Sequence, residues 1–98
     1  MLHLDPIIHQ PVRLQIMAAL TALPQDAQME FVALRKMLGL SDGNLSVHLR
    51  KLEDAGYVQV EKAFVGRKPR TFIAATPTGR VAFDEHVQAL QAIIQRSE

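Results

Sequence analysis

The side chains best suited to chemistry in this 98-residue sequence are cations gathered in its middle third. Residues 41–70 carry a net charge of +2, whereas residues 1–40 sum to zero and residues 71–98 to −1. Within that third, the run from Lys62 to Arg70 holds four cations and no anion. A short basic run is often only a solvated loop, but this one lies between two strand-like segments, at the expected tip of a hairpin. It is therefore a candidate contact for the phosphates of a nucleic acid.

A second group of candidate residues precedes this run at helical spacing. From residue 42 to about 55, three leucines recur on one face, which is the pattern of a helix packed on a core. The opposite face and its flanks carry Gly43, Asn44, Ser46, Val47, Arg50 and Lys51. Asparagine can pair with adenine, serine can donate or accept, and valine can touch the thymine methyl group. The alternative is the ordinary solvated face of an amphipathic helix.

Four helices would position these side chains. Proline and glycine punctuation and the apolar spacing predict them over Pro11–Leu23, Phe31–Leu38, 42–55 and 77–95. Gly39 is expected to end the second helix, and Ser41 to cap the third. Thr76 is expected to cap the last helix. His48 lies near the core edge of the third helix, where a half-buried structural role is favoured over a base contact.

A β-hairpin would present the basic run. Alternating residues predict strands over 57–60 and 71–75, with a turn-rich tip over 65–70. Gly39-Leu40 is a short link between the second and third helices, which is typical of a helix-turn-helix. The sequence thus predicts an α+β, mostly α fold of three helices, a hairpin and a long last helix.

Length and composition narrow the class of protein. We expect residues 1–98 to form a single domain, with 48% hydrophobic and 21% charged residues. The absence of cysteine excludes disulfides, thiolate metal sites and thiol switches. No apolar run is long enough for a membrane span, and no secretory signal is predicted, so a cytoplasmic location is expected. No phosphate loop, serine elbow or HExxH motif is present, so an enzyme is not expected.

These features together resemble a winged helix-turn-helix transcriptional regulator of the MarR/ArsR-like group, in its compact members. The stretch from Leu38 to Val58, with its Ala55-Gly56-Tyr57-Val58 ending, carries the resemblance, followed by Gly66–Thr71 and Thr76–Arg80. The resemblance implies that the third helix enters the DNA major groove through Ser41, Gly43, Asn44, Ser46, Val47, Arg50 and Lys51. It implies that the hairpin, or wing, contacts flanking DNA through Arg67, Lys68 and Arg70.

The two ends of the chain carry further apolar residues that predict a homodimer interface. The last helix repeats apolar residues at spacings of four and three, and a second patch lies near the N-terminus. The predicted interface residues are Leu4, Ile7, Ile8, Phe83, Val87, Leu90 and Ile94, with Leu2 in the same N-terminal patch. A twofold axis would present two recognition helices to a palindromic operator in double-stranded DNA.

Two alternatives remain open at this point. One is a winged-helix protein–protein interaction module, which the near-neutral net charge of +1 permits. The other is a metal- or ligand-responsive sensor, because Asp84 and His86 resemble half of the helix-borne zinc site of ArsR-type sensors. The matching pair of ligands further along the helix is missing, so neither a metal nor another cofactor is expected. The operator and any effector are not predictable from the sequence.

Overall fold

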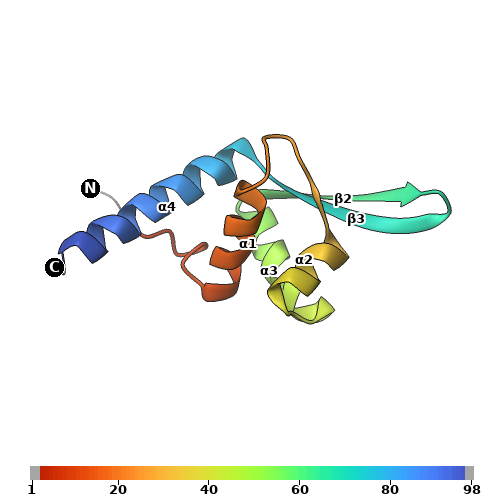
Figure 1. Ribbon diagram of the computed structural model, residues 1–98, viewed down its shortest axis with the longest axis horizontal. Coiled ribbons are helices and arrows are strands. Elements are labelled where there is room, and N and C mark those ends of the chain that lie inside the picture. The colour runs from red at the N-terminus through yellow and green to blue at the C-terminus, as the bar shows by residue number, and fades with distance from the viewer. Residues whose placement is uncertain (1–2, 97–98) are drawn as a thin grey trace.

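The computed structural model describes residues 3–96 and contains four helices and one small sheet. In chain order the elements are α1 Pro11–Thr21, β1 Met29–Glu30, α2 Phe31–Leu38, α3 Asp42–Asp54, β2 Val58–Val65, β3 Lys68–Ala75 and α4 Pro77–Arg96. Figure 1 shows the hairpin and the last part of α4 pointing in opposite directions from a central body made of α1, α2 and α3. The described chain extends over 54 × 25 × 21 Å. The predicted α+β arrangement of three helices, a hairpin and a long last helix is confirmed.

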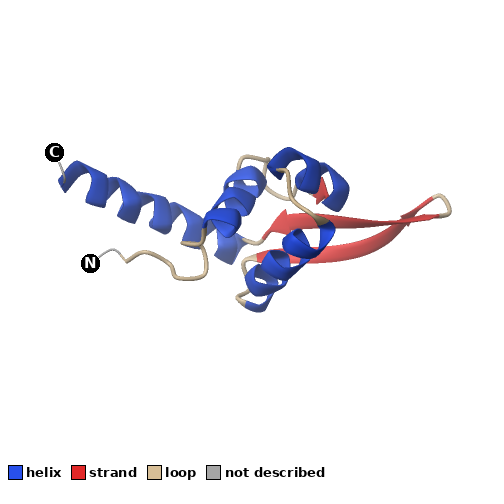
Figure 2. Cartoon of the chain, turned by 90° about the horizontal axis from the view of Figure 1, so that it is seen from below, coloured by secondary structure: helices blue, strands red, loops and turns tan. Residues whose placement is uncertain are grey.

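The sheet is antiparallel, with strand order β1-β3-β2. The β2–β3 hairpin continues in register from the Val58–Ala75 pair to the Val65–Lys68 pair. Only Gly66 and Arg67 remain in the loop, and Gly66 takes a positive φ of 66° that suits glycine in a tight reversal. The strands are therefore longer than predicted, because pairing across the hairpin extends them where the sequence lacks an apolar alternation. Figure 2 shows the outer part of this narrow hairpin extending beyond the helices.

The core lies where α1, α2, α3 and the base of the hairpin meet. It is formed by buried aliphatic side chains, namely Ile8, Ile16, Met17, Leu20, Leu34, Leu45, Leu49, Leu52, Val58 and Ile73. The three leucines of α3 are all buried, as their spacing predicts. The burial of Ile8 means that the N-terminal segment belongs to the same core as the helices. 

The start of α4 is fastened to the rest of the fold at three points. The Thr76 hydroxyl accepts from the Gly79 N–H at 2.9 Å and donates to the Gly56 carbonyl at 2.6 Å. Gly79 packs so closely on Tyr57 that a Cβ there would lie 2.0 Å from the Tyr57 carbonyl oxygen. The Arg80 guanidinium donates to the carbonyl of Thr21, the last residue of α1, and to the carbonyls of Leu23 and Pro24 just beyond it. Thr76, Gly79 and Arg80 therefore have structural roles, with the Arg80 side chain hydrogen-bonded within the fold.

Candidate nucleic-acid interface

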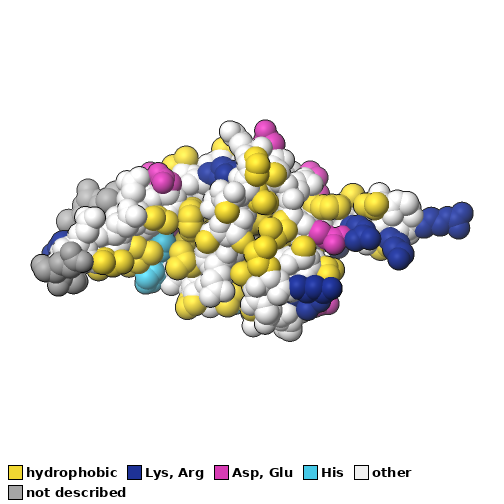
Figure 3. Space-filling model, in the orientation of Figure 1, with side chains coloured by type: hydrophobic (Ala, Val, Ile, Leu, Met, Phe, Trp, Pro, Cys, Tyr) yellow, Lys and Arg dark blue, Asp and Glu magenta, His cyan; other side chains and the backbone are white. Residues whose placement is uncertain are grey.

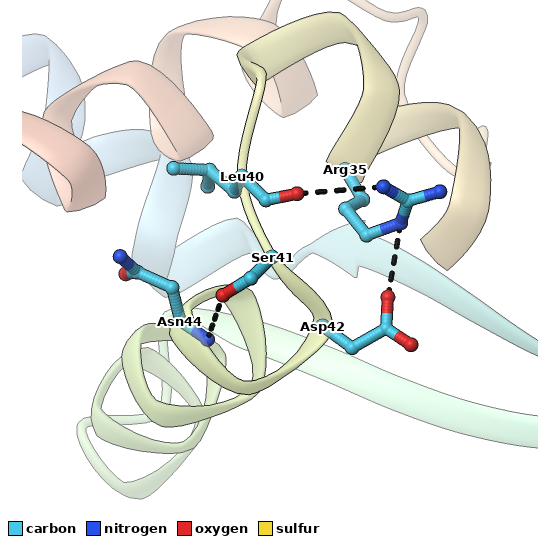
Figure 4. Close-up of polar contacts among 5 residues, drawn as sticks. All are labelled: Arg35, Leu40, Ser41, Asp42 and Asn44. Atoms are coloured by element: carbon cyan, nitrogen blue, oxygen red, sulfur yellow. Dashed lines mark hydrogen bonds and ion pairs between the residues drawn. The ribbon is translucent and has the colours of Figure 1, made fainter.

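The N-terminus of α3 is fixed by two local contacts (Figure 4). The Ser41 hydroxyl accepts from the Asn44 N–H at 3.1 Å, which is the predicted cap. Arg35 of α2 forms an ion pair with Asp42 at 3.0 Å and donates to the Leu40 carbonyl at 3.4 Å. The Asn44 side-chain amide is directed away from these contacts. The turn between the two helices is thus held in place, and the first turn of α3 presents its polar side chains outward.

The predicted contact face of α3 is exposed along its length. Every one of its predicted residues is exposed, namely Ser41, Gly43, Asn44, Ser46, Val47, Arg50 and Lys51. Among the described residues, neither Arg50 nor Lys51 has an acidic partner. Two cations and a row of small polar side chains therefore share one accessible surface.

A groove of about 600 Å³ separates α3 from the hairpin. The helix contributes Ser46, Leu49 and Arg50 to its walls, and the hairpin contributes Val60, Lys62 and Thr71. Lys62 thus faces the same groove as Arg50. Lys62 is not among the predicted wing residues, because the predicted strand ended at residue 60. In the longer β2 strand, side chains two residues apart share a face, and this alternation places Lys62 on the same face as Val60. Glu53 and Asp54 also line the groove, so its positive character is limited to the part nearer the N-terminus of α3.

The three predicted wing cations differ in their surroundings. Arg67 lies in the loop and Lys68 begins β3, and within residues 3–96 neither has an acidic partner. Arg70, in contrast, forms an ion pair and hydrogen bond with Glu30 of β1. This contact joins the hairpin to β1 and neutralises the charge of Arg70, so Arg70 is less available to a phosphate than Arg67 or Lys68. The turn expected over 65–70 is corrected accordingly, since residues 68–70 belong to β3.

Two histidines that the sequence singled out are structural. His48 is half-buried, and its Nδ1 lies 3.2 Å from Nη1 of Arg13. Burial, followed by the charges of Arg13 and Lys51, lowers the pKa of His48. The expected half-burial of His48 is confirmed, and its contact with Arg13 agrees with the structural role that the sequence favours.

His86 and Asp84 do not come together. His86 is fully buried on the core side of α4, whereas Asp84 is exposed and accepts from Gln88 at 2.9 Å. Within residues 3–96, no group of three or more His, Asp or Glu side chains is placed to hold a metal ion. The geometry therefore gives the zinc-sensor alternative no ligand set among these residues.

The predicted dimer residues fall into three classes of exposure. Ile8 has no exposed surface, so its assignment to an interface between protomers is wrong; it packs inside its own protomer instead. The half-buried members are Leu4, Ile7, Phe83, Val87 and Leu90. Ile94 is 60% exposed on the part of α4 that extends beyond the body. Leu2 lies outside the described residues.

No helix within the described residues is long and apolar enough to cross a membrane. 

Comparison with known proteins identifies the family to which this chain belongs. Residues 12–94 match the winged helix DNA-binding domain family, and the chain belongs to that family. A transcriptional regulator homologue from Pyrococcus horikoshii OT3 superposes with a TM-score of 0.86 at 34% identity, over 94% of this chain and 88% of that one. A MarR-family regulator from Enterococcus faecalis V583 gives a TM-score of 0.70 at 25% identity, over 93% and 76% of the two chains. These similarities confirm the predicted MarR-like resemblance.

One relative known from its sequence is nearly the same size. MJ0432, an uncharacterized protein of Methanocaldococcus jannaschii, is 36% identical over 92 residues, covering 94% of this chain and 97% of the relative. The similarity thus includes the helices, the wing and most of α4.

Proposed function

We propose that this protein is a sequence-specific transcriptional regulator that binds double-stranded DNA as a homodimer and represses by occluding its operator. In this proposal residues 1–98 act as one domain. The N-terminal part of α3 enters the major groove, and the hairpin contacts the flanking backbone or minor groove.

The observation that carries the proposal is the pairing of two exposed surfaces across one groove. On one side lies the small polar face of α3 with Arg50, and on the other lies the hairpin with Lys62. Small side chains allow the helix backbone to approach base edges closely, and cations on both walls suit the phosphates on either side. Membership of the winged helix DNA-binding family supports duplex DNA as the partner.

Dimerisation is supported by the placement of apolar residues at one end of the molecule. Figure 3 shows hydrophobic side chains along α4, at the end of the long axis opposite the hairpin. Leu90 and Val87 are half-buried there, and Ile94 is exposed. A twofold axis at this end would hold the two α3 helices between it and the outward-pointing wings. In that arrangement the wings meet the outermost base pairs of a palindromic site.

Selection of duplexes from a random library at near-physiological salt tests the proposal directly. We expect an enriched palindrome whose half-sites lie about one helical turn apart, roughly 10 base pairs. Enrichment of a single half-site would contradict the dimer. Failure to enrich any sequence, in a protein whose circular dichroism shows it folded, would contradict sequence-specific DNA binding and favour the protein–protein module.

A further inference from the structure

The outer part of the wing carries an exposed apolar side chain, whereas the DNA contacts proposed above for the wing involve only its cations. Phe64 is 75% exposed, the largest exposed fraction among the large hydrophobic residues that the structure describes as exposed. It pairs in register with Pro69 on the opposite strand, one pair before the Val65–Lys68 pair that closes the loop. Neighbouring residues on one face of a hairpin contact each other, so the two form a small apolar ridge near the tip.

Strand alternation places this ridge on the side of the hairpin that faces α3. Val60 and Lys62 precede Phe64 at intervals of two residues, and both line the groove beside α3. Side chains two apart in a strand share a face, so Phe64 continues that face beyond the groove toward the tip. Val65, which is 54% exposed, points to the opposite face and offers a matched comparison.

The charges around the ridge favour DNA over a protein as the surface that covers it. Lys62 shares the face of Phe64, Arg67 lies in the loop, and Lys68 pairs with Val65 on the other face, while no acidic residue occurs between Glu61 and Asp84. A second copy of the hairpin would bring like charges together, which opposes self-association at this tip. Apolar wedges, including phenylalanine, are used by proteins that enter the minor groove of duplex DNA, where phosphates line both edges.

We propose that Phe64, supported by Pro69, is an apolar wedge that enters the DNA minor groove beside the α3 contact and partly unstacks one base step. This inference rests on the proposed function. It adds a residue that would favour DNA sequences whose base steps are easily deformed. Pyrimidine–purine steps separate most easily, so such a step is expected where the wing meets the operator. Arg67 and Lys68 then hold the flanking phosphates while Phe64 makes the apolar contact.

The test uses the duplex that the unaltered protein enriches from a random library, with a fluorescent adenine analogue placed in turn along its flanks. Emission of the analogue rises when its base is unstacked. We expect Phe64→Ala to weaken binding about tenfold, to leave the salt dependence unchanged because no charge is lost, and to abolish the rise in emission. Phe64→Leu should retain most of the binding, since leucine is also found as a wedge. Val65→Ala should bind as the unaltered protein does.

Each other outcome is decisive as well. Equal affinity and equal emission for Phe64→Ala and the unaltered protein would overturn the wedge while leaving the proposed function standing. A change in sedimentation coefficient without a change in DNA affinity would show that the ridge contacts protein, which also overturns it. If the unaltered protein enriched no duplex, the proposed function itself would fail, and this inference with it. Thermal unfolding serves as the folding control, because a side chain this exposed contributes little to the core.

Discussion

The backbone N–H of Asp5 donates a hydrogen bond to Nδ1 of the fully buried His86, with 2.9 Å between the two nitrogens. The contact joins the N-terminal segment to α4 across 81 positions of sequence. The Asp5 carboxylate adds to the junction by accepting from the Tyr57 hydroxyl and from the N–H groups of Ile7 and Ile8. The end of the molecule that we assign to the dimer is therefore built around a neutral histidine whose Nδ1 acts as an acceptor.

Protonation of His86 should destabilise the fold. Burial is the largest cause of its lowered pKa, followed by the charge of the neighbouring His9, whose ring centroid lies 5.3 Å away; Asp5 opposes the shift more weakly. Because the folded protein holds the proton less tightly than the unfolded chain, stability is full above pH 6.5 and falls as the pH drops below that value. Urea unfolding at a series of pH values measures this loss.

The control for that prediction is His86→Gln, which keeps a neutral acceptor at the same place. His48 also has a lowered pKa and contributes to the fall in the same direction, so the variant should retain a smaller pH dependence rather than none. An identical pH dependence in the variant and the unaltered protein would show that His86 is not the group responsible.

Tyr57 is the only tyrosine of the chain, and there is no tryptophan, so its ionisation can be followed by ultraviolet absorbance without interference. Its hydrogen bond to Asp5 raises its pKa to about 12, with burial and the charges of Asp5 and Glu85 adding to the shift. The raised value means that stability is full below pH 10 and is lost as the pH rises toward 12. Asp5→Asn should move the absorbance midpoint back toward 10, whereas an unmoved midpoint would contradict the role of this hydrogen bond.

Gly79 and Gly43 form a matched pair of helical glycines with opposite expectations. A Cβ at Gly79 would lie 2.0 Å from the Tyr57 carbonyl oxygen, whereas nothing lies within 4 Å of a Cβ at Gly43. We expect Gly79→Ala to lower the free energy of unfolding by about 3 kcal/mol, because backbone must move to relieve the overlap. Gly43→Ala should raise it by up to about 1 kcal/mol through helix propensity. Equal effects in chemical denaturation would refute the close packing of α4 on Tyr57.

Helix caps and helix-ending glycines predicted much of this fold. Each acts on residues only a few positions away, so it can be recognised in the sequence. The Ser41 hydroxyl reaches an N–H three positions ahead, and Gly39 takes the left-handed conformation that ends α2. Such signals depend only on residues that are neighbours in the chain. The bounds of α2 and α3 could therefore be predicted nearly to the residue.

Three further features that sequence reasoning missed depend on contacts between distant parts of the chain. β1 is only two residues long and exists because Met29 and Glu30 pair with β3. The Glu30–Arg70 contact spans 40 positions and pairs one of the predicted wing cations with a carboxylate. The burial of Ile8 follows from packing that its apolar type alone does not distinguish from an exposed interface. Periodicity identifies which residues share a face, but the packing of the whole chain decides what that face meets.

Leu90→Glu tests the dimer. Leu90 is half-buried on α4, so a carboxylate there would lie in the apolar contact that we propose between protomers. We expect sedimentation equilibrium to show monomers, and DNA affinity to fall about 100-fold because the two half-sites are no longer bound together. Gln91→Glu, on an exposed position of the same helix, is the charge control. An unchanged dimer in Leu90→Glu would exclude this face of α4 as the interface.

Separate substitutions on α3 and on the wing should divide affinity from specificity. Arg67→Ala and Lys68→Ala remove cations that have no acidic partner among residues 3–96, so each should lower the magnitude of the logarithmic salt slope by about 0.9 if its side chain contacts one phosphate. Arg70→Ala should leave the slope nearly unchanged, since Glu30 already binds that guanidinium.

Asn44→Ala removes no charge and should weaken binding to the preferred duplex about tenfold while leaving binding to random duplex unaltered. Fluorescence anisotropy titrations over a range of salt concentrations measure all four variants. If Asn44→Ala reduced binding to both duplexes equally, α3 would contribute no sequence readout at that position, and the assignment of α3 as the recognition helix would lose its principal residue.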